Sequence, residues 1–199
     1  MTLAPAPERL GMSMEEFLRR SAAEGDFELI NGEKIERMST VFGHGAIANF
    51  IALLLNMFAI PKQLGKAYVE MSFVIPGQES GNWVVGSRIP DVSFYAQARL
   101  EAYHSVTPDS QHKPLALLPD LVIEVLSPND KYAEITAKVD LYLRDGVSLI
   151  WVVDLDAQTV VVHAPGQPPV ILRGTDTLTA GDLLPGFSTA VSDLFSPSA

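Results

Sequence analysis

A short apolar run with one carboxylate inside it decides how the fold is interpreted: Leu118-Pro119-Asp120-Leu121-Val122-Ile123-Glu124-Val125-Leu126-Ser127-Pro128. The run is too short for a helix of ordinary length, is rich in β-branched residues and ends at a Ser-Pro pair, which is typical of a buried strand. An ionised carboxylate in a dry core costs several kcal/mol unless it is paired, protonated or bound to a metal. Glu124 is therefore a candidate functional residue.

Alternation along this strand separates its acidic and apolar side chains. Successive side chains point to opposite faces of a strand, so Asp120 and Glu124 share one face while Ile123 and Val125 share the other. We predict that the acidic face borders a cleft.

The length and composition predict one compact domain. The chain has 199 residues, of which 47% are hydrophobic, so we expect a single domain over residues 1–199 with a loose tail over residues 1–12. No apolar run approaches the roughly 20 residues that span a bilayer, and the first residues do not resemble a signal peptide. We expect a cytoplasmic protein with no membrane partner. The absence of cysteine excludes disulfides, thiolate metal sites and a cysteine nucleophile.

The net charge of −10 works against non-specific binding to nucleic acids, which requires Lys and Arg to neutralise phosphates. An acidic protein can still act on nucleic acid if a local basic patch and bound cations reverse the field at the site. The sequence does not reveal such a patch, and the acidic surface is explained equally well by solubility.

The first half of the chain predicts two helices, a hairpin and two longer strands. Ser13 to Glu16 has the spacing of a capping box, and Asn31-Gly32 is a strong hairpin turn signal. The expected elements are a helix from Ser13 to about Ala23, a hairpin of Phe27–Ile30 with Glu33–Met38, a long helix over His44–Ile60, and strands over Ala67–Ile75 and Trp83–Tyr95.

The second half predicts a strand-helix-strand unit. A helix from Pro128 to about Arg144 joins the strand at Glu124 to an apolar strand at Ser148–Asp154, and such units are normally parallel. Further elements are expected, namely a short helix at Gln97–Tyr103, paired strands at Thr159–His163 and Val170–Arg173, and a helical turn at Val191–Phe195.

Two carboxylates and a lysine together suit phosphodiester hydrolysis. Asp91 follows Pro90 on one strand, Glu124 lies on the next, and Lys138 lies on the following helix, one turn before Tyr142. Carboxylates offer hard oxygen ligands to Mg²⁺, which lowers the pKa of a bound water. A lysine can orient that water or neutralise charge that develops on the phosphate.

These residues resemble the PD-(D/E)XK nuclease superfamily, and most closely its Uma-type branch of restriction endonuclease-like proteins. The resemblance covers roughly residues 24–195. It rests on landmarks in order along the chain, namely Phe27–Glu33, His44 at the start of the long helix, Arg88-Ile89-Pro90-Asp91-Val92, Pro119–Pro128, Lys138 with Tyr142, and Gly146–Asp154. It implies an α/β (α+β) fold with a restriction-endonuclease-like core, in which helices flank a mixed central sheet and an N-terminal hairpin is added.

The resemblance also implies roles for individual residues. Asp91 and Glu124 would bind a divalent metal, Mg²⁺ or Mn²⁺, with the Val125 carbonyl as a further ligand. The superfamily pattern has a lysine two residues after the glutamate, where this chain has Leu126. In this branch the lysine is displaced onto the following helix, which makes Lys138 the catalytic candidate and Lys131 its alternative.

Structural explanations stay open for the catalytic candidates. Glu124 and Lys138 could form a purely structural ion pair, or Lys138 could pair with Glu134 one turn earlier. Asp91 could cap the irregularity at Pro90, and Asp120 could simply start its strand.

Other candidates fall outside this trio of Asp91, Glu124 and Lys138. His44, Glu33, Asp120, Tyr142 and Lys131 are candidates for contacts around the metal ligands or with substrate. His44 could instead be an ordinary helix N-terminal residue. By default, Glu28, Glu33 and Glu36 are expected to be solvated.

The sequence thus predicts a Mg²⁺-dependent endodeoxyribonuclease that hydrolyses DNA phosphodiester bonds. One alternative is a catalytically degenerate nuclease-fold module for binding or assembly, and another is a small-molecule phosphoester hydrolase with the same metal site. A homodimer is expected from the function, because two strands are most easily cut by a two-fold pair of sites.

Overall fold

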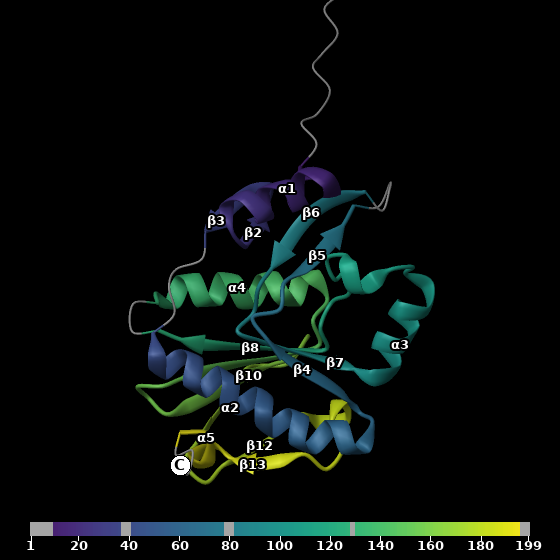
Figure 1. Ribbon diagram of the computed structural model, residues 1–199. Helices are drawn as coiled ribbons and strands as arrows, with labels where there is room; N and C mark the ends of the chain where they lie inside the picture. The colour runs from purple at the N-terminus through teal and green to yellow at the C-terminus, as the bar shows by residue number, and fades with distance from the viewer. Residues whose placement is uncertain (1–9, 37–40, 78–81, 128–129, 196–199) are drawn as a thin grey trace, which may run out of the picture. The chain divides into compact units, whose positions relative to one another are not determined.

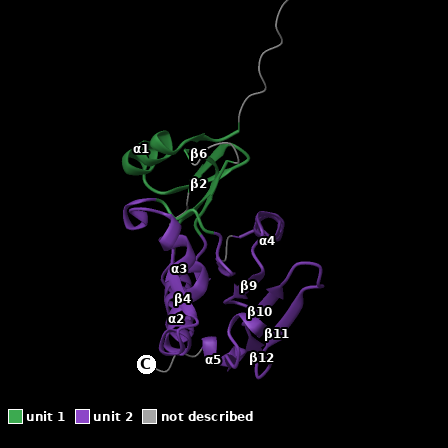
Figure 2. Cartoon of the chain, turned by 90° about the vertical axis from the view of Figure 1, so that its right-hand side faces the viewer, with its two compact units in different colours: residues 1–38, 72–89, 114–117 green, residues 39–71, 90–113, 118–199 purple. Residues whose placement is uncertain are grey.

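The computed structural model describes residues 10–36, 41–77, 82–127 and 130–195. The chain divides into two compact units, coloured separately in Figure 2. Unit 1 consists of Met1–Met38, Ser72–Ile89 and Pro114–Leu117, and unit 2 of Ser39–Met71, Pro90–Lys113 and Leu118–Ala199. Each unit is therefore assembled from segments that are distant in sequence. The single domain over residues 1–199 stays a prediction.

Unit 1 is an antiparallel sheet with one helix. Strand β6 pairs with β1, β2 and β5, and β2 also pairs with β3. The elements are β1 (Met12–Ser13), α1 (Met14–Glu24), β2 (Phe27–Ile30), β3 (Glu33–Glu36), β5 (Phe73–Pro76) and β6 (Trp83–Arg88). The predicted loose tail over residues 1–12 extends too far toward the C-terminus, because Met12 belongs to β1 and pairs with Val84. Residues 1–9 of that tail lie outside the described residues.

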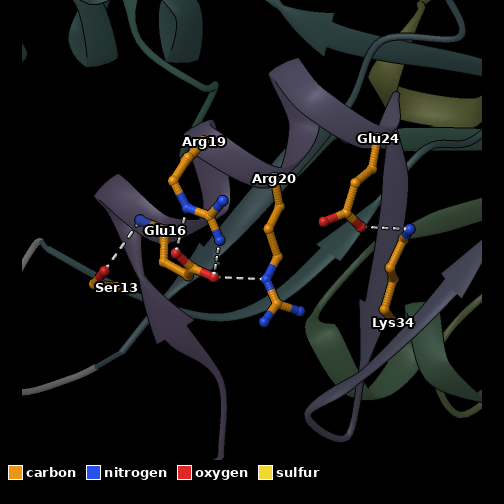
Figure 3. A network of polar contacts seen from close by, with 6 residues as sticks. All are labelled: Ser13, Glu16, Arg19, Arg20, Glu24 and Lys34. Atoms are coloured by element: carbon orange, nitrogen blue, oxygen red, sulfur yellow. Dashed lines mark hydrogen bonds and ion pairs between the residues drawn. The ribbon is translucent and has the colours of Figure 1, made fainter.

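Helix α1 begins where the capping-box pattern predicts. The Ser13 Oγ accepts the Glu16 backbone N–H at 3.1 Å, which satisfies one of the free donors of the first turn. The Glu16 carboxylate in turn accepts hydrogen bonds from Arg19 and Arg20, which lower its pKa to about 2. Figure 3 shows this network together with the ion pair of Glu24 on α1 and Lys34 on β3. Polar contacts thus join the end of α1 to the hairpin.

The β2–β3 hairpin is also confirmed. Asn31 and Gly32 have φ values of 52° and 83°, as a two-residue turn matching the strand twist requires. The predicted end of the second strand at Met38 lies outside the described residues.

Unit 2 contains a six-stranded mixed sheet in the order β11-β10-β9-β8-β7-β4. Strands β8 and β9 are parallel and are joined by a helix, as predicted, whereas the other pairs are antiparallel. The strands are β4 (Gly65–Val69), β7 (Val92–Ala96), β8 (Leu121–Leu126), β9 (Leu149–Asp154), β10 (Thr159–His163) and β11 (Val170–Arg173). The predicted mixed sheet with flanking helices is confirmed.

Two helices cover the two faces of this sheet, α2 (Phe42–Ala59) and α4 (Tyr132–Asp145), and Figure 1 shows them on either side of β8. Ile51 of α2 belongs to the same buried core as Ile123 of β8, whereas α4 contacts the Glu124 side chain on the opposite face. The remaining elements of unit 2 are α3 (Gln97–Val106), α5 (Val191–Phe195), β12 (Thr177–Thr179), β13 (Ser188–Ala190) and the 3₁₀ turns Ile60–Lys62, Ser110–His112 and Gly181–Leu183.

Two of the predicted strands are wrong as continuous elements. The segment Ala67–Ile75 forms β4 and β5, which belong to different sheets and are separated at Glu70, a non-glycine residue with φ of 50°. The segment Trp83–Tyr95 forms β6 and β7, which are separated at Ile89 and Pro90, where proline has no N–H for a ladder. The chain passes between the two units at both breaks, and Asp91 directly follows the second.

Among the described residues, one helical stretch is long and apolar enough to cross a membrane, although no such stretch was expected from the sequence. Phe42–Lys62 has 21 residues and a mean hydropathy of 1.6. The core helix of a globular protein has the same character, and the inward side of α2, including Ile51 and Leu55, is buried in the core of unit 2. The stretch is therefore weak support for a membrane span.

Gly65 offers a test of the β4–β7 pairing. Its φ is 150°, and a Cβ at this position would overlap the Tyr95 carbonyl oxygen. We expect Gly65→Ala to lower the free energy of unfolding by about 2–4 kcal/mol in urea denaturation. Gly43→Ala is the control, because its Cβ meets no atom within 4 Å and lies in a helix, where alanine is favoured by up to about 1 kcal/mol. Equal stabilities of the two variants would contradict the pairing.

Candidate functional site

Asp91, directly before β7, and Glu124, within β8, lie side by side on neighbouring strands. Strands β7 and β8 are antiparallel with Val92 opposite Ile123, and one further step of this register places Asp91 opposite Glu124. The Asp91 Oδ2 accepts the Val125 backbone N–H at 2.8 Å, so this carboxylate is fastened to β8. Each of the two acids is only 5% exposed. The structure thus brings together the two carboxylates that the sequence predicts as metal ligands.

Helix α4 supplies two hydrogen-bond donors to Glu124. The Tyr142 hydroxyl donates to Oε1 at 2.6 Å, and the Lys138 ammonium donates to Oε2 at 2.8 Å. The two donors are four residues apart and therefore lie on one face of the helix. The alternative lysine, Lys131, is exposed and pairs with Glu134 at 2.9 Å. Lys138 is thus the lysine at the site.

The position of Glu124 is electrostatically strained. Burial raises the pKa of Glu124 to about 7; Lys138 opposes this rise, while the neighbouring charge of Asp91 adds to it. A second carboxylate beside a buried one is unfavourable when both are ionised. A cation bound between them would remove that repulsion.

His44 contacts the other member of the pair. It lies in the first turn of α2 with its Nε2 3.1 Å from the Asp91 Oδ2, and this contact raises the pKa of His44. The ring is 7% exposed, and its Nδ1 has no hydrogen-bond partner among the described residues. His44 therefore positions the Asp91 carboxylate from the α2 side of the sheet.

A third acid, Glu70, was missed by the sequence analysis. Val69 of β4 lies opposite Val92 of β7, so Glu70 follows opposite Asp91, and its N–H donates to the Asp91 carbonyl at 3.0 Å. Glu70 at the end of β4, Asp91 at the start of β7 and Glu124 within β8 thus occupy neighbouring positions across three adjacent strands. No pattern in the sequence indicated this acid, because a continuous strand was predicted across Glu70. Glu70 lies beside Asp91 at the edge of the site because β4 ends at Val69.

Two further candidates, Asp120 and Glu33, have other surroundings. Asp120 precedes β8, at the end of that strand remote from Val125, where it accepts from Arg99 at 2.7 Å and from the Ala96 N–H at 2.8 Å. It therefore holds the start of α3. Glu33 is an exposed residue of β3 in unit 1.

The expectation that Glu28 is solvated is wrong. Glu28 is buried in β2 and accepts the Ile89 N–H at 2.9 Å, because β2 pairs on both sides and lies inside the sheet.

The donor set fits a hard divalent cation with few protein ligands. The described residues contain no group of three or more His, Asp or Glu side chains placed to hold a metal. Mg²⁺ does not require one, since it is commonly bound by one or two carboxylates with waters and substrate phosphates as the other ligands. Asp91 and Glu124 supply such a pair. The backbone N–H of Val125, the residue after Glu124, connects the two by donating to Asp91.

The buried carboxylate predicts a pH dependence of stability in chelating buffer. The raised pKa of Glu124, about 7 against a usual 4.5, means that the folded state binds its proton more tightly than the unfolded state. The free energy of unfolding should therefore fall as pH rises from about 4.5 to about 7, by up to about 3 kcal/mol. Glu124→Gln should lack this component, whereas Glu134→Gln, an exposed change on α4, should keep it. Parallel pH profiles of wild type and Glu124→Gln in urea denaturation would contradict the assignment.

A solved structure with the same fold exists. It comes from Anabaena variabilis ATCC 29413 and is described as "a putative nuclease belonging to DUF820". Its sequence is 24% identical, the match covers 93% of this chain and 98% of that one, and the TM-score is 0.73. This similarity confirms the predicted fold. No curated protein matches the chain.

The sequence itself matches a family over most of its length. Residues 14–192, which include Asp91, Glu124 and Lys138, match the family described as "Uma2: Putative restriction endonuclease". The resemblance stated from the motifs is thereby confirmed, and the chain belongs to this family.

Proposed function

We propose that the protein is a divalent-metal-dependent endonuclease that hydrolyses phosphodiester bonds of DNA. The observation that carries the proposal is the buried pair of Asp91 and Glu124 with Lys138 at 2.8 Å from the Glu124 carboxylate. Membership of the family described as "Putative restriction endonuclease" supports it. The description of the Anabaena protein as a nuclease agrees with it.

Asp91 and Glu124 would hold the metal, Mg²⁺ or Mn²⁺, and the Val125 carbonyl is the candidate third protein ligand. A bound divalent ion supplies a water of lowered pKa and stabilises negative charge on phosphate oxygens. The chain keeps both carboxylates in place beforehand: Asp91 through the Val125 N–H and His44, and Glu124 through Tyr142 and Lys138.

Lys138 has a further role in this proposal. Its side chain is one-third exposed while its ammonium contacts a buried carboxylate, so it can meet both the site and a substrate. A positive charge in this position stabilises the charge that develops on the phosphate during hydrolysis. It also places a positive charge at the site of a protein whose net charge of −10 weakens the binding of a polyanion.

Two alternatives remain as proposals. Leu126 occupies the position where the superfamily pattern has lysine, and both Glu124 oxygens already accept protein hydrogen bonds. These facts favour a non-catalytic module that keeps the fold for binding or assembly. A hydrolase of small phosphoesters would use the same carboxylates. The homodimer and the cytoplasmic location also stay predictions.

Cleavage of plasmid and single-stranded DNA with Mg²⁺, Mn²⁺ or chelator tests the proposed function. The wild type should cut only with metal. Asp91→Ala and Glu124→Ala should lose at least about 100-fold in rate, because each removes a ligand of the metal, and Lys138→Ala should lose about the same, because it removes the charge beside the reacting phosphate. Lys131→Ala, an exposed change at the residue that directly precedes the same helix, is the matched control and should cut like the wild type.

Other outcomes separate the alternatives. Metal-dependent cutting that survives in Asp91→Ala would contradict the site. The absence of any cutting by the wild type would favour the non-catalytic module, and hydrolysis of mononucleotide esters alone would favour the small-molecule hydrolase.

A further inference from the structure

A cavity of about 450 Å³ opens beside Asp91, within unit 2. Asp91 and His44 form its wall on the side of the site. The other lining residues include Val69 and Glu70 at the end of β4, and Phe42 and Asn49 on α2. Its volume lies within the range of roughly 300–1,000 Å³ that small-ligand pockets occupy. A group bound here would lie next to Asp91, one of the two proposed metal ligands.

The charges of the wall select a kind of ligand. The ionisable lining residues are Glu70, Asp91 and His44, and no lysine or arginine of the described chain lines the cavity. A phosphate placed inside it would face two carboxylates. A neutral ring with N–H donors on its edge is complementary, and adenine, cytosine and guanine carry such amino groups.

Phe42 provides the flat apolar surface that such a ring requires. Its side chain is 92% exposed at the first residue of α2, and it lines the cavity. A phenylalanine this exposed contributes little to a core, whereas successive bases of single-stranded nucleic acids commonly stack on aromatic side chains.

We propose that this cavity receives one unstacked nucleobase of the substrate, which stacks on Phe42 and presents its polar edge to Glu70 and Asn49. The inference rests on the proposed nuclease function and names the form of its substrate, a single-stranded or locally opened nucleic acid. A base inside a duplex would first have to leave its stack, which costs free energy. The backbone beside the seated base would lie at Asp91.

Binding of a single-stranded oligonucleotide carrying the fluorescent base 2-aminopurine tests the inference, in one buffer with chelator and one with Ca²⁺. The wild type should bind this strand more tightly than the matched duplex, and the fluorescence should change on binding. Phe42→Ala should weaken single-strand binding about tenfold and abolish the fluorescence change, because stacking on the ring is lost. Phe42→Trp should preserve both.

Met57→Ala is the matched control. Met57 is also an exposed apolar residue of α2, at 67%, but it does not line the cavity, so its removal should leave binding unchanged. Neither exposed residue supports the core, and all variants should melt like the wild type. Unchanged single-strand binding by Phe42→Ala, or equal affinity of the wild type for duplex and single strand, would overturn the inference.

The test separates this inference from the proposed function. If no nucleic acid is cut but single-strand binding depends on Phe42, the cavity assignment stands and the nuclease proposal fails. If cleavage of DNA depends on Asp91, but Phe42→Ala has the KM and the oligonucleotide affinity of the wild type, the nuclease proposal stands and the cavity assignment fails. The absence of any oligonucleotide binding in either buffer overturns the cavity assignment.

Discussion

The ion pair of Glu124 and Lys138 is the interaction on which the rest of the site depends. Glu124 lies in a strand whose neighbours Ile123 and Val125 are buried, and removing either partner of such a pair leaves a charge without compensation. The pair requires α4 to pack on this face of the sheet in one rotational setting, since Tyr142 must reach the same carboxylate. The parallel β8-α4-β9 unit is therefore a condition for ionised Glu124, and the proposed cation beside Asp91 would complete the compensation of its charge.

The register of the sheet places two further acids in a row with Glu124. The antiparallel pairing of β7 with β8 places Asp91 opposite Glu124, and the pairing of β4 with β7 places Glu70 opposite Asp91. Both β4 and β7 have an end here because the chain passes between the two units after Met71 and after Ile89. The breaks that interrupt two longer strands thus leave acids at strand ends, beside a cavity, instead of inside a continuous ladder.

The parts of this arrangement that depend on short stretches were predictable from the sequence. Glu124 stood out because it interrupts an apolar run, and the spacing of Lys138 and Tyr142 placed both on one helix face. Glu70 and the buried Glu28 were not predictable in this way, because their surroundings come from strands distant in sequence. The division of Ala67–Ile75 between two sheets was missed for the same reason: local pattern shows strand character but not the pairing partner.

The central claim is that Asp91 and Glu124 are kept as a pair for a divalent cation, and Mn²⁺ binding tests it without any substrate. Titration followed by electron paramagnetic resonance should show saturable Mn²⁺ binding to the wild type. Asp91→Asn and Glu124→Gln should each weaken that binding at least tenfold, because each removes one anionic ligand from a set with few protein ligands. Wild-type affinity in both variants, or no Mn²⁺ binding by the wild type, would contradict the account.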